Sequence, residues 1–111
     1  MIEKIVLEYL QQNIAVPCGL EVPKTPPESF IVIEKTGSGR RDRIMRATLA
    51  IQSYAGSMVE AIELNENVKN AMFEIVSLPE IGACELNSDY NYTDTSSKRY
   101  RYQAVFDITH Y

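Results

Sequence analysis

The sequence predicts an α+β domain in which a mostly antiparallel sheet of about five strands is flanked by two helices, in the order α-β-β-β-α-β-β. Two segments have the apolar spacing of amphipathic helices. The other periodic segments are β-branched, or alternate between apolar and polar residues as half-buried strands do. No β-α-β unit is repeated along the chain, which argues against a doubly wound parallel sheet.

The length and composition fit one globular domain. We expect residues 1–111 to form a single domain, because 45% of them are hydrophobic and 23% are charged. No apolar run reaches the roughly 20 residues that a membrane span requires, and Glu3, Lys4 and Glu8 interrupt any signal-peptide pattern. We therefore expect the protein to bind no membrane and to stay in the compartment where it is made.

The first helix is predicted over residues 2–13, because Ile2, Ile5, Val6, Tyr9 and Leu10 recur on one helical face. Residues 19–22 are predicted to be a short edge strand, since the flanking prolines cannot donate ladder hydrogen bonds. Residues 30–33 are apolar on both faces, which is typical of a central strand covered on two sides.

A polar, glycine-containing loop is predicted over residues 37–43 (GSGRRDR), exposed to solvent. The next strand alternates. One face is predicted to carry Met45, Ala47, Leu49 and Ile51, and the other Arg46, Thr48, Ala50 and Gln52.

The long helix is predicted over residues 57–78. Ser57 and Glu60 have the spacing of a capping box, and Pro79 and Gly82 end the helical pattern. Its predicted apolar stripe consists of Met58, Ala61, Ile62, Val68, Met72, Ile75 and Val76.

The C-terminal segment predicts a hairpin with a polar turn over residues 93–98. Its first strand is predicted to place Cys84, Leu86, Ser88, Tyr90 and Tyr92 on one face. Its second strand is predicted to place Tyr100, Tyr102, Ala104, Phe106 and Ile108 on one face, opposite Arg99, Arg101, Gln103, Asp107 and Thr109.

Residues that carry out chemistry are scarce. The only histidine, His110, is penultimate and is predicted to be too loosely held for catalysis. Cys18 and Cys84 fit no metal or redox spacing and are predicted to be buried thiols rather than a disulfide. We therefore expect a protein that is not an enzyme, with no catalytic residues, no cofactor and no bound metal.

A basic cluster near the predicted loop is the most informative polar feature. Three interpretations are open: an ordinary solvated loop, a protein–protein contact, or a contact with phosphates. The net charge of −4 and the many surface glutamates favour a protein contact over nucleic acid. The candidate subunit interface consists of Gly37, Ser38, Gly39, Arg40, Arg41, Arg43 and Arg46.

The C-terminal hairpin supports an alternative function. Tyr90, Tyr92, Tyr100 and Tyr102 are predicted to form cross-strand pairs, with Lys98, Arg99 and Arg101 nearby. Aromatic and basic side chains together suit single-stranded nucleic acid. The alternative is therefore a small nucleic-acid-binding module that uses Arg40 to Arg43 and this hairpin.

Three segments carry a family resemblance: residues 26–39 (PPESFIVIEKTGSG), 47–55 (ATLAIQSYA) and 87–111 (NSDYNYTDTSSKRYRYQAVFDITHY). They resemble the tail-terminator or tail-completion proteins among the head–tail joining proteins of long, non-contractile-tailed phages and prophages of Gram-positive bacteria. The resemblance does not separate a tail terminator from a neighbouring head-completion protein.

The resemblance implies a homo-oligomer, a hexameric ring under assembly conditions, that caps the tail tube and joins it to the head connector. Tail-tube and head-connector proteins would be its partners, and DNA would only pass through the ring. The family has no catalytic residues, and its extended loop would correspond to residues 37–43, which would reach an adjacent subunit. The implied location is the bacterial host cytoplasm during assembly and the head–tail junction in the virion.

Overall fold

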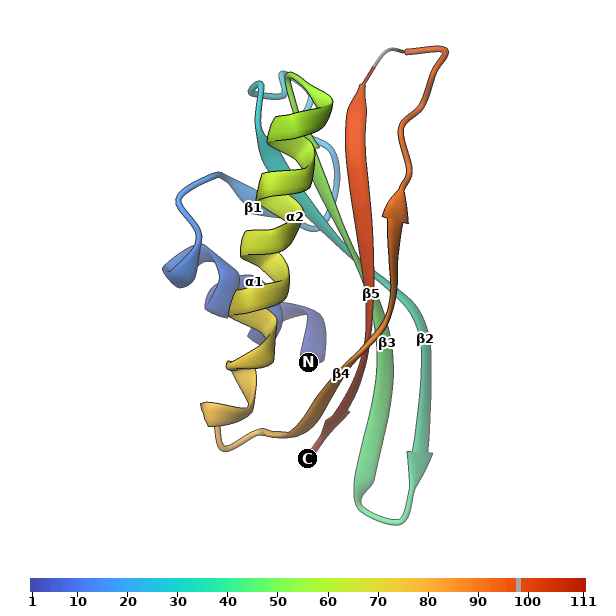
Figure 1. Ribbon diagram of the computed structural model, residues 1–111. Coiled ribbons are helices and arrows are strands. Elements are labelled where there is room, and N and C mark those ends of the chain that lie inside the picture. The colour runs from blue at the N-terminus through green and yellow to red at the C-terminus, as the bar shows by residue number, and fades with distance from the viewer. Residues whose placement is uncertain (98) are drawn as a thin grey trace.

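The computed structural model describes residues 1–97 and 99–111, and in it a five-stranded sheet carries both helices on one face (Figure 1). The elements are α1 (Ile2–Asn13), β1 (Cys18–Gly19), β2 (Phe30–Arg41), β3 (Ile44–Ala55), α2 (Met58–Phe73), the 3-10 turn η1 (Ile75–Ser77), β4 (Ile81–Asn91) and β5 (Tyr100–His110). The strand order is β1-β2-β3-β5-β4, and only the β1–β2 pair is parallel. The predicted α+β class and element order are confirmed.

The hydrophobic core lies between the two helices and one face of the sheet. Its fully buried side chains include Val6 and Leu10 of α1, Leu49 and Ile51 of β3, Val68 and Met72 of α2, and Phe106 and Ile108 of β5. The faces predicted for β3 and β5 are therefore confirmed. The other face of β3 is also buried, at Ala50, Gln52 and Tyr54.

The end of α2 differs from the prediction. The Ser57 half of the predicted capping box is present, since Ser57 Oγ accepts a hydrogen bond from the Glu60 N–H at 3.2 Å. The helix then ends at Phe73 rather than near residue 78, and η1 follows. This early end turns the chain so that Ile75 enters the core before β4 begins.

The buried face of α2 is also different. Its buried residues are Ala61, Leu64, Asn65, Val68 and Met72, whereas Ile62 and Val76 of the predicted stripe are exposed. The prediction placed Ile62 inside because apolar residues lie on two sides of this helix, and periodicity alone does not say which side meets the sheet.

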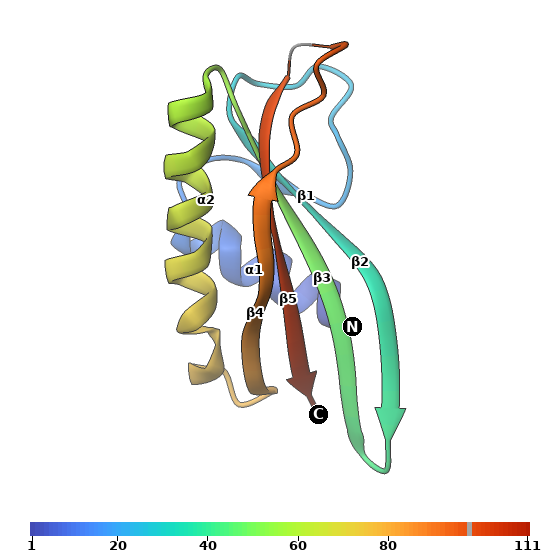
Figure 2. The ribbon, with the colours of Figure 1, turned by 45° about the vertical axis from the view of Figure 1, so that its right-hand side comes forward.

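The loop predicted over residues 37–43 is mostly strand. β2 runs to Arg41 and pairs with Ile44 of β3, so that only Asp42 and Arg43 form the turn, with Asp42 at φ 56°. No core lies beneath this part of the hairpin, so its side chains do not alternate between apolar and polar. For this reason the segment has the composition of a loop although it is a strand. Figure 2 shows this hairpin continuing past the end of the body.

The predicted positions of strands β1 and β2 agree only in part with the structure. The predicted edge strand at residues 19–22 is instead Cys18–Gly19, next to Ile31 and Val32. All four residues from Phe30 to Ile33 are buried, as expected, but the central strand of the sheet is β3 rather than β2.

The predicted common face of β4 is wrong. The register shifts between Leu86 and Ser88, so Cys84 and Leu86 pack against the core while Tyr90 pairs with Gln103 on the other face. An irregularity of this kind moves all later side chains to the opposite face.

Candidate interaction surfaces

The outer half of the β2–β3 hairpin, residues 34–46, is called the arm below. Every residue of the arm is exposed. Among the described residues, β1 pairs with β2 only at Ile31 and Val32, so the outer backbone edge of β2 has no strand partner along the arm. Such an edge is available for contact with another chain.

All residues of the predicted subunit interface lie on the arm, but the basic cluster is divided between its faces. Arg40 pairs with Met45 and lies on the face that carries the helices, whereas Arg46 pairs with Gly39 and lies on the opposite face with Arg41. Arg43 is in the turn, and Arg40 Nε donates to the backbone oxygen of Asp42 at 3.1 Å. The arm therefore presents positive charge in several directions.

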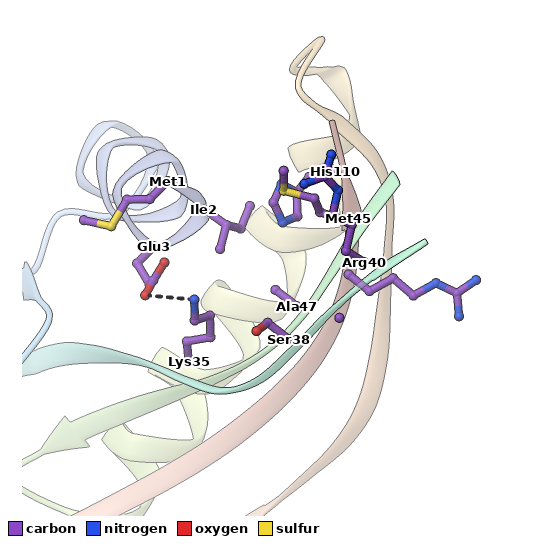
Figure 3. Close-up of a pocket in the computed structure, with 11 residues that line it drawn as sticks. Met1, Ile2, Glu3, Lys35, Ser38, Arg40, Met45, Ala47 and His110 are labelled. Atoms are coloured by element: carbon purple, nitrogen blue, oxygen red, sulfur yellow. Dashed lines mark ion pairs between the residues drawn. The ribbon is translucent and has the colours of Figure 1, made fainter. Parts of the chain in front are cut away.

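A hollow of about 380 Å³ lies between the base of the arm and the start of α1 (Figure 3). Its apolar lining comes from Met1, Ile2, Met45 and Ala47, and its ionisable groups are Glu3, Lys35, Arg40, Arg46 and His110. In Figure 3 Glu3 and Lys35 point toward each other, at 3.6 Å, while Arg40 extends away from the hollow.

His110 is better ordered than the sequence suggested. It pairs with Met45 on one side and Ile81 on the other and is only 8% exposed, so the prediction of a loosely held residue is wrong. Burial lowers the pKa of His110. Among the described residues no hydrogen bond joins His110 to Ser38 or to Glu3, as a serine–histidine–acid arrangement would require.

The sheet face away from the helices carries an aromatic and arginine cluster. The rings of Phe30 and Tyr54 stack with centroids 4.4 Å apart, and Arg101 Nη1 donates to Tyr54 Oη at 2.8 Å. The Arg101 guanidinium also lies 4.4 Å from the centre of the Tyr92 ring. Arg101 is therefore already held by neighbours within the fold.

The predicted cross-strand tyrosine pairs are wrong. Tyr90 of β4 and Tyr92, just after β4, lie on this open face and contact each other edge to face at 5.9 Å. Tyr100 and Tyr102 lie on the opposite face, in line with Ala104. Lys98, assigned to the same hairpin, lies outside the described residues.

Neither cysteine is disulfide-bonded, and both are half-buried. Burial raises the pKa of Cys18 to about 11, and burial with nearby Asp107 and Glu85 raises that of Cys84 to about 11. Thiols with such pKa values are poor nucleophiles at neutral pH.

Residues 1–97 and 99–111 contain neither a metal-binding cluster nor a membrane-spanning helix. No group of three or more histidine, cysteine, aspartate or glutamate side chains is arranged to hold a metal ion. Within the same ranges, neither helix has the length and apolar character needed to span a bilayer.

Comparison with models of known protein families finds none that matches this chain, and comparison with curated proteins finds no matching relative.

Proposed function

We propose that this chain is a structural assembly protein whose copies associate through the arm into a ring, and that the ring is the tail terminator that the family resemblance implies. The ring would be a hexamer that caps the tail tube and offers a surface to the head connector. The site of this function is the interface named above, from Gly37 to Arg46.

The observation that carries the proposal is the uninterrupted exposure of the arm. It includes Ile44, which is 43% exposed, and Met45, which is 37% exposed, together with four arginines. Neither glycine of the arm has a positive φ, and a Cβ at Gly37 or Gly39 would meet no atom within 4 Å. Glycine in a strand with open space beside it is typical of a place where another backbone approaches.

A ring requires two different surfaces on each copy, since one patch must meet another patch on the next subunit. An arm that lies outside its own core is suited to be one of these surfaces. The net charge of −4 also agrees with a passage that DNA crosses without being bound.

The test is the mass of the full chain in solution, measured by light scattering after size exclusion and by sedimentation velocity. We expect an oligomer of defined size, a hexamer if the ring closes as proposed. Arg41→Glu should weaken association, because it reverses one charge of the arm without removing a hydrogen bond of the fold. Lys24→Glu makes the same charge change at an exposed position outside the arm and serves as the control.

Two results would count against the proposal. One is a chain that stays monomeric up to about 1 mM, where even an association of about −4 kcal/mol is detectable. The other is an oligomer that responds equally to Arg41→Glu and Lys24→Glu.

The alternative function, a nucleic-acid-binding module, is supported by the arginines of the arm and by the aromatic face. It is less favoured because Arg101 already contacts Tyr54 and Tyr92, which leaves fewer groups for a base or phosphate. Fluorescence anisotropy with a labelled single strand at low salt distinguishes the two. Binding that falls steeply with salt and is lost in Arg41→Glu would favour the alternative.

A further inference from the structure

Helix α2 exposes a row of large apolar side chains on the side that does not meet the core. Val59 is 64% exposed, Ile62 39% and Phe73 51%, and Val76 in the following turn is 48% exposed. Val59, Ile62, Glu66, Lys69 and Phe73 follow an alternation of three and four residues, which places them along one side of the helix. We call Val59, Ile62, Phe73 and Val76 the α2 row.

The α2 row lies outside the hydrophobic core of a single copy. The core contacts of α2 are made by its other side, through Ala61, Leu64, Val68 and Met72. The row is made of two apolar pairs, Val59 with Ile62 and Phe73 with Val76, with the Glu66–Lys69 ion pair between them. Exposed apolar side chains that occur in pairs, rather than singly, are typical of a place where another molecule binds.

The charges along α2 are opposite to those of the arm. Between Met58 and Phe73 the helix carries three glutamates and one lysine, while residues 40–46 carry four arginines and one aspartate. Glu63 follows Val59 by four residues and therefore borders the α2 row. Among the described residues Glu63 forms no ion pair, whereas Glu66 is paired with Lys69 at 2.7 Å.

The arm matches the α2 row in apolar character as well, because Ile44 is exposed on the same face of the arm as Arg41 and Arg46. Both ribbon views show the tip of the arm beyond the end of the body and away from α2 (Figures 1 and 2). An arm cannot therefore cover the row of its own copy, and a second copy is the occupant that fits both the charge and the apolar surface.

We propose that the α2 row accepts the arm of a neighbouring copy, with Ile44 of that copy against the apolar side chains and with Arg41 and Arg46, on the same face of the arm, beside Glu63. This inference rests on the proposed function, in which the arm mediates self-association, and it adds the second surface that a ring requires. The contact is heterologous, since the arm of one copy meets the helix of the next.

Phe73→Ser tests the acceptor surface in the full chain. We expect association to weaken by about tenfold or more, because aromatic side chains at the centre of an interface contribute most of its binding energy. Asn67→Ser, on an exposed position of the same helix outside the α2 row, is the matched control and should leave association unchanged. Thermal unfolding of both variants checks that the fold is retained.

A charge exchange tests the partner. Glu63→Arg and Arg41→Glu should each weaken association, and the chain carrying both should recover it in part, because the opposite charges again face each other. A mixture of Phe73→Ser chains with Arg41→Glu chains should form dimers but no larger species, since each chain retains one intact surface.

The outcomes separate the inference from the proposed function. A wild-type chain that remains monomeric contradicts both. A chain that associates, responds to Arg41→Glu and does not respond to Phe73→Ser overturns the acceptor surface and leaves the proposed function standing. Weakening by Phe73→Ser without any effect of Arg41→Glu would mean that two α2 rows pack on each other, which also overturns the inference.

Discussion

Lys69 of α2 and Asp89 of β4 form an ion pair, with Lys69 Nζ 2.9 Å from Asp89 Oδ2. Asn65 Nδ2 donates to the same carboxylate oxygen at 3.1 Å, and Lys69 is also paired with Glu66 at 2.7 Å. The Lys69 side chain is only 15% exposed, so its bonds hold α2 to the edge strand in a place that solvent reaches poorly. Its hydrogen bonds to Glu66 and Asp89 raise the pKa of Lys69.

Lys69→Met should lower the free energy of unfolding by about 1.5–3 kcal/mol, the usual range for a hydrogen bond to a charged group. Methionine keeps the length of the side chain but leaves Asp89 with Asn65 as its remaining side-chain donor. Urea unfolding measures the change. Glu66→Gln alters the more exposed partner and should cost less than about 1 kcal/mol. Equal costs for the two variants would contradict this ranking.

Tyr54 should contribute to stability mainly through its ring. Tyr54→Ala removes the stack on Phe30 and the contact with Arg101, and we expect a loss of about 3–5 kcal/mol in unfolding free energy. Tyr54→Phe keeps the stack and loses only the hydroxyl, for which about 1 kcal/mol is expected. Thermal unfolding would refute the explanation if the two variants were equally destabilised.

His110 should make stability depend on pH. Burial lowers its pKa in the folded chain, so below the unfolded value of about 6.5 the unfolded chain binds more protons than the folded one. The stabilisation that buried, neutral His110 contributes is therefore complete above about pH 6.5. It is lost as the pH falls from that value toward the lower pKa of His110 in the folded chain. We expect His110→Gln to be less sensitive than the wild type between about pH 7.5 and 5.5 in urea unfolding. Parallel curves for the two chains would exclude this role.

The two glycines of the arm should be replaceable without loss of fold. Because Gly37 and Gly39 have no positive φ and open space at the Cβ position, alanine at either should raise the free energy of unfolding by about 0.5 kcal/mol. Gly56→Ala provides the contrast, since its Cβ would have to displace the exposed Glu28 side chain, and we expect no net gain in unfolding free energy. Differential scanning calorimetry distinguishes the three chains, and a destabilised Gly37→Ala chain would show that the arm is constrained within one copy.

The elements whose apolar residues recur at a regular spacing could be predicted from the sequence. The bounds of α1 agree with its prediction, because its apolar residues recur on one face only. The alternation in β5 gave the correct faces for Phe106 and Asp107, since no irregularity interrupts its pairing with β3.

The register of β4 and the buried side of α2 depend on contacts with other elements, and the sequence of the strand or helix alone does not determine them. The register shift after Leu86 is an event between two strands, and nothing in the sequence of β4 marks it. Ile62 and Leu64 are equally apolar, and only the packing of α2 on the sheet decides that Leu64 is the buried one.

The candidate site was predicted in part. The arginines of the arm could be identified because four basic residues in a short polar segment have no role in a core. The α2 row was missed because Ile62 and Val76 were assigned to the core, and Val59 and Phe73 were assigned to no surface. An excess of apolar residues around a helix with a single buried face would have been the signal for it.

The strand order also governs how the chain folds. β5 lies between β3 and β4, so the β2–β3 hairpin and β4 have no ladder in common until β5 is in place. During synthesis β5 leaves the ribosome after all of them, and the pairing of Met45 with His110 closes a long segment of chain. The edges of β3 and β4 that face β5 therefore stay unpaired until β5 has been made, and unpaired edges are open to association with other chains in that interval.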